Sequence, residues 1–270
     1  MKLRKNIITL FTLAFVLSAT SSCEYHKLKK SKNPEVKTQA AHNYYDEGKY
    51  AKAITLYEDI ILMKRNTQGY EKILYRYADA YYQVKDYILA GYYFRKFTEA
   101  FPKSEYAEEA QFMSAYCYYL DAPKTSLDQE ATYTAINEFS LFLTKYPNSD
   151  KVPECNRLID ELRGKLEDKA FKNASLYYDL GHYKAAVTAL KNSLEDYPDT
   201  QREEETRFLI LKSAFVYAEK SIRSKQNERY EDAAKYYRSF INRFPDSEYR
   251  KDADKIYKDI QNFFENKQTI

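Results

Sequence analysis

The side chains that most often carry catalysis are few in this chain and lie far apart. The three histidines are His26, His42 and His182, and no two of them have the spacing of a metal-binding pair. No glycine-rich phosphate loop or nucleophile elbow occurs in the sequence. The many acidic residues fall on polar helix faces, where a solvated surface accounts for them. The sequence therefore predicts a protein that is not an enzyme and that holds no metal or cofactor.

One cysteine stands in a context that predicts a covalent modification. Residues 1–5 are basic, an apolar run extends from Ile7 to Leu17, and small residues at 18–22 lead directly to Cys23. This order is typical of a signal peptide that ends in a bacterial lipobox, although Thr20 occupies the place where Leu is usual. We expect residues 1–22 to be removed and Cys23 to carry lipid that anchors the chain to a membrane. An ordinary secretory signal with an incidental cysteine is the alternative.

Removal of the signal changes the charge of the chain. The signal contains three basic residues and no acidic one, so the 43 basic residues become 40, equal to the 40 acidic residues. A formally neutral mature chain does not support a large nucleic-acid footprint, which requires a basic surface.

Two cysteines remain in the mature chain, Cys117 and Cys155. Both fall on expected helices. An exported protein can pair such residues, but their spacing does not decide the matter. We favour two buried free thiols, and a disulfide is the alternative.

A series of paired tyrosines predicts a binding surface. The pairs are Tyr44-Tyr45, Tyr81-Tyr82, Tyr118-Tyr119 and Tyr177-Tyr178. Neighbouring helical residues point about 100° apart, so we expect the first of each pair to pack between helices and the second to line an inner groove. Tyrosine suits peptide recognition because its ring provides contact area while its hydroxyl stays hydrogen-bonded. The candidate peptide-binding residues are His42, Tyr45, Tyr75, Asp79, Tyr82, Phe112, Tyr116, Tyr119 and Tyr178.

The elements that position these side chains are marked by a phrase that occurs four times. It reads FPKS at 101–104, YPNS at 146–149, YPDT at 197–200 and FPDS at 244–247, with prolines 45, 51 and 47 residues apart. A period in this range indicates a helical repeat protein. Pro ends a helix because it lacks an N–H and clashes with the preceding turn, and the Ser or Thr two residues later suits the N-cap of the next helix.

A second pattern precedes the phrases and sets the register of the repeats. It consists of a tight turn, an aromatic residue, a small Ala three residues later and a large apolar residue beyond it, as in Gly48-Lys49-Tyr50 with Ala53 and Tyr57. This resembles the tetratricopeptide repeat. We therefore predict an all-α fold: a right-handed superhelix of five tetratricopeptide-like helix pairs with a C-terminal capping helix. The expected repeats cover 34–67, 71–104, 105–149, 167–200 and 203–247.

Several segments depart from the repeat. We expect an insertion at 121–128 within the third repeat, an additional helix at 151–166, an extended loop at 221–227 and the capping helix at 249–265. The expected organisation is a lipoprotein signal peptide (1–22), a lipidated N-terminus and tether (23–33), repeats one to three (34–149), and a helix with repeats four and five and the capping helix (150–270).

The chain resembles the BamD (ComL) family of outer-membrane protein assembly lipoproteins. The most specific segments are 94–97 with 101–104, 128–129 with 146–149, and 174–178 with 196–200. The resemblance implies a periplasm-facing protein that is lipid-anchored in the outer membrane. It also implies association with a BamA-like β-barrel insertase and other assembly lipoproteins. Repeats one to three would receive unfolded outer membrane proteins, and repeats four and five would dock on the insertase. The alternative is a tetratricopeptide lipoprotein scaffold of another envelope system, in cell-wall and division coordination or glycan uptake.

Overall fold

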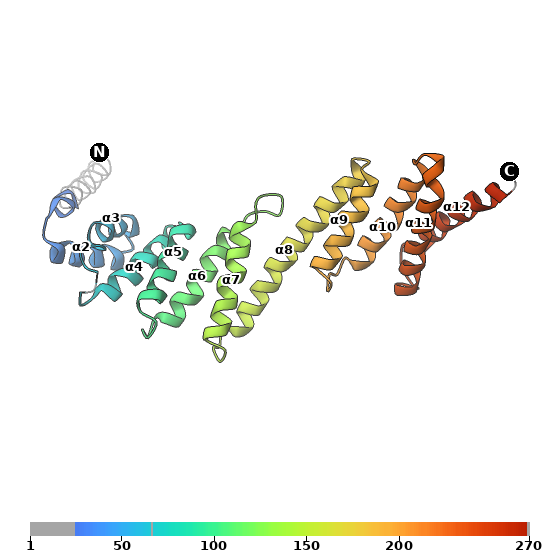
Figure 1. The fold of residues 1–270 in the computed structure, drawn as a ribbon. Helices are drawn as coiled ribbons and strands as arrows, with labels where there is room; N and C mark the ends of the chain where they lie inside the picture. The colour runs from blue at the N-terminus through green and yellow to red at the C-terminus, as the bar shows by residue number, and fades with distance from the viewer. Residues whose placement is uncertain (1–24, 66, 269–270) are drawn as a thin grey trace, which may run out of the picture. The chain divides into compact units, whose positions relative to one another are not determined.

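The computed structural model describes residues 25–65 and 67–268 (Figure 1). These residues form helices and connecting turns, with no strand among them, so the expected all-α class is confirmed. The signal peptide and Cys23 lie outside the described residues. Residues 25–30 are helical. The helices that follow are α2 (Pro34–Asp46), α3 (Tyr50–Ile60), α4 (Tyr70–Gln83), α5 (Tyr87–Ala100), α6 (Ala107–Asp121), α7 (Glu130–Lys145), α8 (Val152–Asp179), α9 (Tyr183–Asp196), α10 (Glu203–Glu219), α11 (Arg223–Arg243) and α12 (Arg250–Gln268).

The helices follow one another in the expected pairs. In chain order the pairs are α2–α3, α4–α5, α6–α7, α8–α9 and α10–α11. Helix α12 packs on α10 and α11, with Ala253 and Ile260 buried and Ile256 packed beside them, which confirms the capping helix.

The turns within three pairs place one residue in the left-handed region. Gly48 (φ 72°) and Gly181 (φ 78°) occupy that position in the first and fourth pairs, and Lys85 (φ 64°) occupies it in the second. Glycine adopts this conformation without steric cost, whereas a residue with a Cβ does so at a penalty. Lys85 is therefore the one strained backbone position of this kind among the described residues.

The four proline phrases begin each following helix in the same way. The hydroxyls of Ser104, Ser149, Thr200 and Ser247 accept the backbone N–H two residues later at 3.0–3.1 Å. The helix begins one residue beyond that N–H, so the Ser or Thr stands in the turn before the cap rather than at the cap.

The residue that donates this N–H also covers an aromatic ring on the first helix of the preceding pair. Ring or cation centres lie 4.6–5.0 Å from the covered ring in all four repeats. The pairs are Tyr106 on Tyr75, Lys151 on Phe112, Arg202 on Phe171 and Tyr249 on Phe208. Sequence reasoning missed this contact because the two residues of each pair lie 31–41 positions apart.

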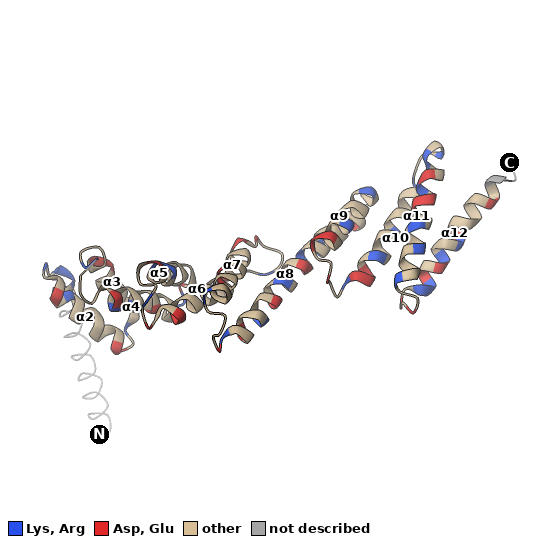
Figure 2. Cartoon of the chain, turned by 60° about the horizontal axis from the view of Figure 1, so that its bottom comes forward, with Lys and Arg blue, Asp and Glu red and all other residues tan. Residues whose placement is uncertain are grey.

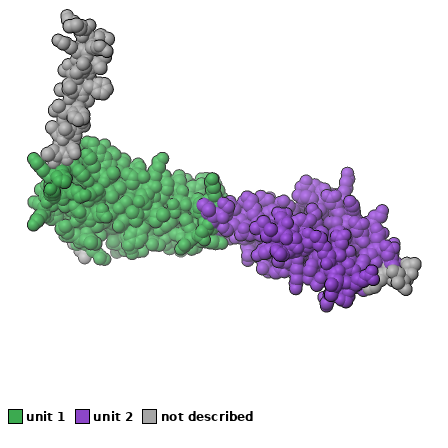
Figure 3. Space-filling model, turned by 90° about the horizontal axis from the view of Figure 1, so that it is seen from above, with its two compact units in different colours: residues 1–124, 128–162 green, residues 125–127, 163–270 purple. Residues whose placement is uncertain are grey.

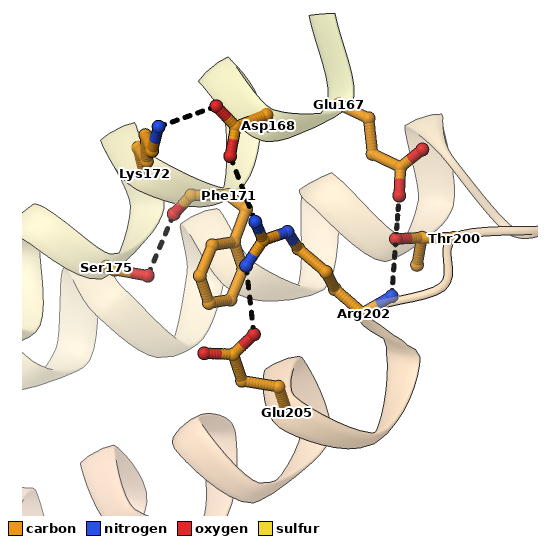
Figure 4. A network of polar contacts seen from close by, with 8 residues as sticks. All are labelled: Glu167, Asp168, Phe171, Lys172, Ser175, Thr200, Arg202 and Glu205. Carbon is orange, nitrogen blue, oxygen red and sulfur yellow. Dashed lines mark hydrogen bonds and ion pairs between the residues drawn. The ribbon is translucent and has the colours of Figure 1, made fainter. Parts of the chain in front are cut away.

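The best-connected example joins α8 to the turn before α10 (Figure 4). The Thr200 hydroxyl donates to Glu167, and Arg202 pairs with Asp168 at 3.1 Å while lying over Phe171. Equivalent residues make the same contacts at α6: Glu108, Glu109, Phe112, Ser149 and Lys151. The recurrence aligns α6 with the second half of α8, since Phe112 and Phe171 hold the same position in their repeats.

The described residues divide into two compact units (Figure 3). The first contains the residues up to Lys124 together with Asp128–Leu162, and the second contains Thr125–Leu127 and the residues from Arg163 onward. The division falls within α8. Cys155, Leu158 and Leu162 enter a core with α6 and α7, whereas Phe171 and Ala174 enter a core with α9 and α10. The domain boundary expected at 149/150 stays a prediction.

Two expectations about helix boundaries were wrong. The additional helix at 151–166 does not end before the fourth repeat but continues into it as α8. No Pro or Gly pair interrupts the segment after Pro153, and an isolated Gly164 is tolerated within a helix. The extended loop at 221–227 is also short, because α11 begins at Arg223. By contrast, the insertion in the third repeat is a loop between Asp121 and Glu130.

Candidate functional site

The first three tyrosines of the expected groove lie on the first helices of successive repeats. Tyr45 lies on α2, Tyr82 on α4 and Tyr119 on α6, and each is half-buried. Each contacts the next first helix along the chain. These tyrosines and the residues that contact them are called the tyrosine face below. Acidic and basic residues are interspersed along the helices that carry it (Figure 2).

At the N-terminal end of the tyrosine face, Tyr45 is held by charged groups from α4. Its hydroxyl donates to Oδ2 of Asp79 at 2.5 Å, and the Arg76 guanidinium lies 4.6 Å from its ring centre. Arg76 in turn pairs with Asp46 at 2.9 Å. Burial raises the pKa of Tyr45, and the bond to Asp79 adds to the rise. The phenol therefore stays protonated and its ring has a defined orientation.

His42 lies near this end of the face and contacts a tyrosine of the core. Its Nδ1 lies 2.7 Å from the hydroxyl of the fully buried Tyr57. Burial, followed by the charges of Arg76 and Lys72, lowers the pKa of His42 to about 4. The imidazole is therefore neutral at neutral pH, and it acts here as a hydrogen-bonding group rather than as a cation.

The middle of the face is an aromatic stack. Tyr116 stacks on Tyr119 with ring centres 5.8 Å apart and an interplanar angle of 20°. Burial raises the pKa of Tyr82 on α4, and the neighbouring Tyr116 on α6 adds to the rise. The Tyr119 hydroxyl donates to Oε1 of Glu161 on α8 at 2.9 Å. The carboxylates of Asp79 and Glu161 thus hold the hydroxyls of the two outer tyrosines.

Two of the predicted groove residues belong to the contact between repeats instead. Phe112 is only 6% exposed because its ring packs against Phe139 and Phe142 while Lys151 lies over it, so its assignment to an open groove was wrong. Tyr75 is half-buried between Phe94, Phe97 and Tyr106, and burial raises its pKa to about 12.

The fourth tyrosine lies in the second compact unit. Tyr178 is half-buried, packs edge-on against Tyr183 at 5.5 Å and has Nζ of Lys212 5.2 Å from its ring centre. Its local setting resembles that of Tyr45, with a cation from the next first helix over the ring. Its participation in one continuous groove stays a prediction.

The first member of each tyrosine pair does not always pack in the core. Tyr81 is buried and Tyr44 and Tyr118 are half-buried, but Tyr177 is 44% exposed. The expectation that all four would be core residues was therefore wrong for Tyr177. In α4 and α6 the preceding second helix covers this position, whereas α8 lacks such a cover among the described residues of its unit.

Sequence reasoning missed the charged residues that orient the tyrosines. Arg76 and Glu161 carry no motif, because each acts on a ring or hydroxyl more than 30 positions away. The only available signal for Arg76 was its place one helical turn before Asp79 on the same face.

The two remaining cysteines are free and buried, as expected. Burial raises the pKa of the Cys117 thiol to about 12 and that of Cys155 to about 11. Thiolate is the reactive form, so neither residue is suited to redox or nucleophilic chemistry.

The described residues contain no group of His, Cys, Asp and Glu side chains placed to hold a metal ion. None of their helices is both long enough and apolar enough to cross a bilayer.

The repeated helix pairs and their turn and proline signatures define a tetratricopeptide-type helical repeat protein. A tetratricopeptide-repeat model matches residues 210–247, which lie within the fifth repeat. A second family model, described as an outer membrane lipoprotein (YfiO), matches residues 31–215. This is more than half of the chain, and the chain belongs to that family. The expectation of an assembly lipoprotein family of non-enzymatic type is thereby confirmed.

A curated relative agrees with the family. The chain is 21% identical over 168 residues to the outer membrane protein assembly factor BamD of Caulobacter vibrioides, across 62% of this chain and 55% of the relative. The chain thus spans about half the length of the relative that it matches.

Among solved structures, the chain is similar to the TPR2AB domain of yeast Sti1. The TM-score is 0.38 and the identity 13%, covering 84% of this chain and 98% of that one. It is also similar to a putative kinesin light chain of Podospora anserina (TM-score 0.32, 13% identity, 76% and 97% coverage). The fold assignment rests on the helices and repeats of this chain itself.

Proposed function

We propose that the protein is a lipid-anchored, non-enzymatic scaffold of outer-membrane β-barrel assembly that receives unfolded barrel proteins and docks on a BamA-like insertase. The match to the outer membrane lipoprotein family over residues 31–215 carries this proposal. The likeness to an assembly factor, BamD, supports the assembly role. Lipid on Cys23 would hold the domain at the outer membrane with its repeats facing the periplasm.

The tyrosine face is the proposed receiving surface for unfolded substrate. Strands of membrane β-barrels alternate apolar and polar residues, so an unfolded barrel segment presents apolar side chains at regular intervals. Half-exposed rings of Tyr45, Tyr82 and Tyr119 provide contacts at successive helices. Because Asp79 and Glu161 already hold two of the hydroxyls, little side-chain freedom is lost on binding, which favours affinity.

The second compact unit is the proposed docking side. It contains repeats four and five with the capping helix, and the resemblance to the BamD family supports an insertase contact in this region. This assignment is regional and names no single docking residue. Other assembly lipoproteins are proposed partners on the same grounds.

Depletion of the protein in its native host tests the function as a whole. We expect the amounts of β-barrel proteins in the outer membrane to fall, while an unrelated outer-membrane lipoprotein stays constant as the control. Affinity capture from solubilised envelopes should recover the insertase. Unchanged barrel proteins would refute the proposal, and capture of cell-wall, division or glycan-uptake proteins without the insertase would favour a scaffold of those systems.

A peptide-binding assay tests the tyrosine face separately. Fluorescent peptides from barrel strands should bind the full mature chain and lose at least tenfold in affinity, about 1.4 kcal/mol, in the double variant Tyr82→Ala with Tyr119→Ala. Tyr133→Ala is the matched control, because Tyr133 is an exposed tyrosine on α7, a second helix. Equal losses in both variants, or none in either, would refute the assignment of the face.

A further inference from the structure

The repeat register identifies two adjacent residues on the first helix of each repeat that the second helix of the preceding repeat normally covers. On α6 these residues are Cys117 and Tyr118, and Cys117 is fully buried against α5. The Ser114 hydroxyl donates to the carbonyl of Gly91 at 3.1 Å. A Cβ on Gly91 would lie 3.1 Å from the Tyr118 ring and 3.3 Å from Cβ of Cys117. Helix α5 therefore lies in close contact with α6, and its glycine permits that approach.

The corresponding positions are buried in two other repeats. On α4 they are Ala80 and Tyr81, and on α10 they are Ser213 and Ala214, all of them buried. Small or aromatic side chains at these positions thus meet a preceding second helix.

On α8 the same position is uncovered. The equivalents of Cys117 and Tyr118 are Leu176 and Tyr177, because Phe171 aligns with Phe112, and they are 52% and 44% exposed. Leu180, one turn further along the same face, is also exposed. A leucine and a tyrosine therefore face solvent at positions that are buried or half-buried on α4, α6 and α10, and their apolar surface has no cover in this unit.

A hollow adjoins these residues within the second unit. Its volume is about 750 Å³, and Tyr177, Tyr183, Ala185, Ala189 and Tyr217 contribute to its lining. Helix α9 turns its buried residues Ala186 and Leu190 toward α8 and α10, so Ala185 and Ala189 lie on an adjacent open side. Small alanines beside large aromatic rings leave room for the side chains of another helix.

The charge around the hollow differs from that at α6. Asp121 ends α6 beside Asp86, the N-cap of α5, and its pKa is raised by burial and by that neighbouring carboxylate. Leu180 occupies the equivalent place on α8, and Lys184 and Lys220 line the hollow nearby. Neither lysine forms an ion pair within the part of the chain that the structure describes, and Nζ of Lys220 lies 3.3 Å from the Tyr183 hydroxyl.

We propose that an amphipathic helix of a partner protein docks on this face, in the place that α5 takes on α6. The occupant needs a Gly or Ala where it crosses Tyr177, as Gly91 does at Tyr118. It also needs acidic residues in its first turn, where Lys184 and Lys220 and the positive end of its own helix dipole favour them. The proposal does not depend on the assembly function, since it follows from the repeat register and the charges alone.

A helix taken from the chain itself provides the probe. A fluorescent, helix-stapled peptide of residues 86–101 contains Gly91 at the crossing position and Asp86 in its first turn. We expect it to bind the full mature chain saturably, as measured by fluorescence anisotropy. Leu176→Asp in the protein should weaken binding at least tenfold. Ile88→Asp is the matched control, because Ile88 is an equally exposed apolar residue on a helix of the other unit.

Further measurements test the mode of docking and its charge. Hydrogen exchange should show added protection on α8 and α9 around residues 176–189 when the probe is bound. The probe variant Asp86→Lys should bind several-fold more weakly, and the difference should shrink at high salt. Circular dichroism verifies that Leu176→Asp remains folded, and Tyr177→Ser serves as a second variant at the same site.

Three outcomes would overturn the proposal. The probe could fail to bind, it could bind Leu176→Asp and wild type equally, or it could protect a different surface. Self-association of the wild-type chain that Leu176→Asp abolishes would assign the face to a second copy of this chain instead. Loss of barrel assembly without loss of probe binding, or the reverse, separates this site from the proposed function.

Discussion

The close contact of α5 on α6 predicts opposite effects for the same substitution at two glycines. Gly91 and Gly164 both lie inside helices, and neither has a positive φ. Replacing a helical glycine by alanine gains about 1 kcal/mol of helix stability where space is free. Nothing lies within 4 Å of a Cβ built on Gly164, so Gly164→Ala should stabilise the chain by about that amount.

At Gly91 the same gain meets a steric cost. The added Cβ would lie 3.1 Å from the Tyr118 ring and 3.3 Å from both Cβ of Cys117 and the Ser114 carbonyl oxygen. The backbone carbonyl and the Cys117 Cβ cannot turn away, so α5 must shift. Overpacking of this kind costs about 1–3 kcal/mol, and it also threatens the Ser114 hydrogen bond to Gly91. We expect Gly91→Ala to destabilise the chain by about 1 kcal/mol in net terms.

Urea unfolding followed by circular dichroism measures both variants against wild type. The midpoint should fall for Gly91→Ala and rise for Gly164→Ala. An equal rise in both would show that α5 does not approach α6 as closely as the structure has it. That result would also remove the template for the helix-docking site on α8.

Three further predictions follow from individual residues. Lys85→Gly should raise the melting temperature, because it removes a left-handed Lys that costs about 1 kcal/mol; an unchanged or lower value would contradict the strained turn. His42 has a pKa of about 4 in the folded state, below its unfolded value of 6.5. Because the unfolded chain therefore binds the proton more readily, the free energy of unfolding decreases as pH falls from 6.5 toward 4. His42→Gln should lose less stability than wild type between pH 7 and pH 4.5 in urea unfolding, and identical losses would refute the assignment. Cys117 and Cys155 should resist a thiol reagent at pH 8 until denaturant is added, as peptide mapping of the labelled chain would show; rapid labelling of either would contradict its burial.

Several features of the fold were predictable because they depend on residues close together in sequence. Proline stops, turn glycines and the Ala that permits close helix packing act within a few positions, so their spacing predicted five helix pairs and the capping helix. The same local rules predicted a Ser or Thr hydroxyl near the start of each following helix, but they placed it at the N-cap, whereas it lies two residues before the cap. The predicted helix boundaries were wrong where no stop signal separates two segments, as in the run from 151 to 179 and at Arg223.

The candidate site was predictable only in part. The repeat register placed Tyr45, Tyr82 and Tyr119 on successive first helices, and the helical angle between neighbours separated them from the tyrosines before them. Neither identified Arg76 and Glu161, which contact those tyrosines from other helices. The periodicity of one helix shows which of its residues share a face, but it does not show which side chains of other helices contact that face.

The sequence by itself determined the all-α repeat architecture and the register of its helix pairs, and the signal that it predicts before Cys23 stays a prediction. Only the tertiary structure decided which equivalent residues are covered. Phe112 is buried because α7 and Lys151 pack against it, and Tyr177 is exposed although Tyr81 is buried. The physical reason is that secondary structure follows short-range backbone preferences, whereas burial is a property of the neighbouring helix that packs against a position or is missing from it.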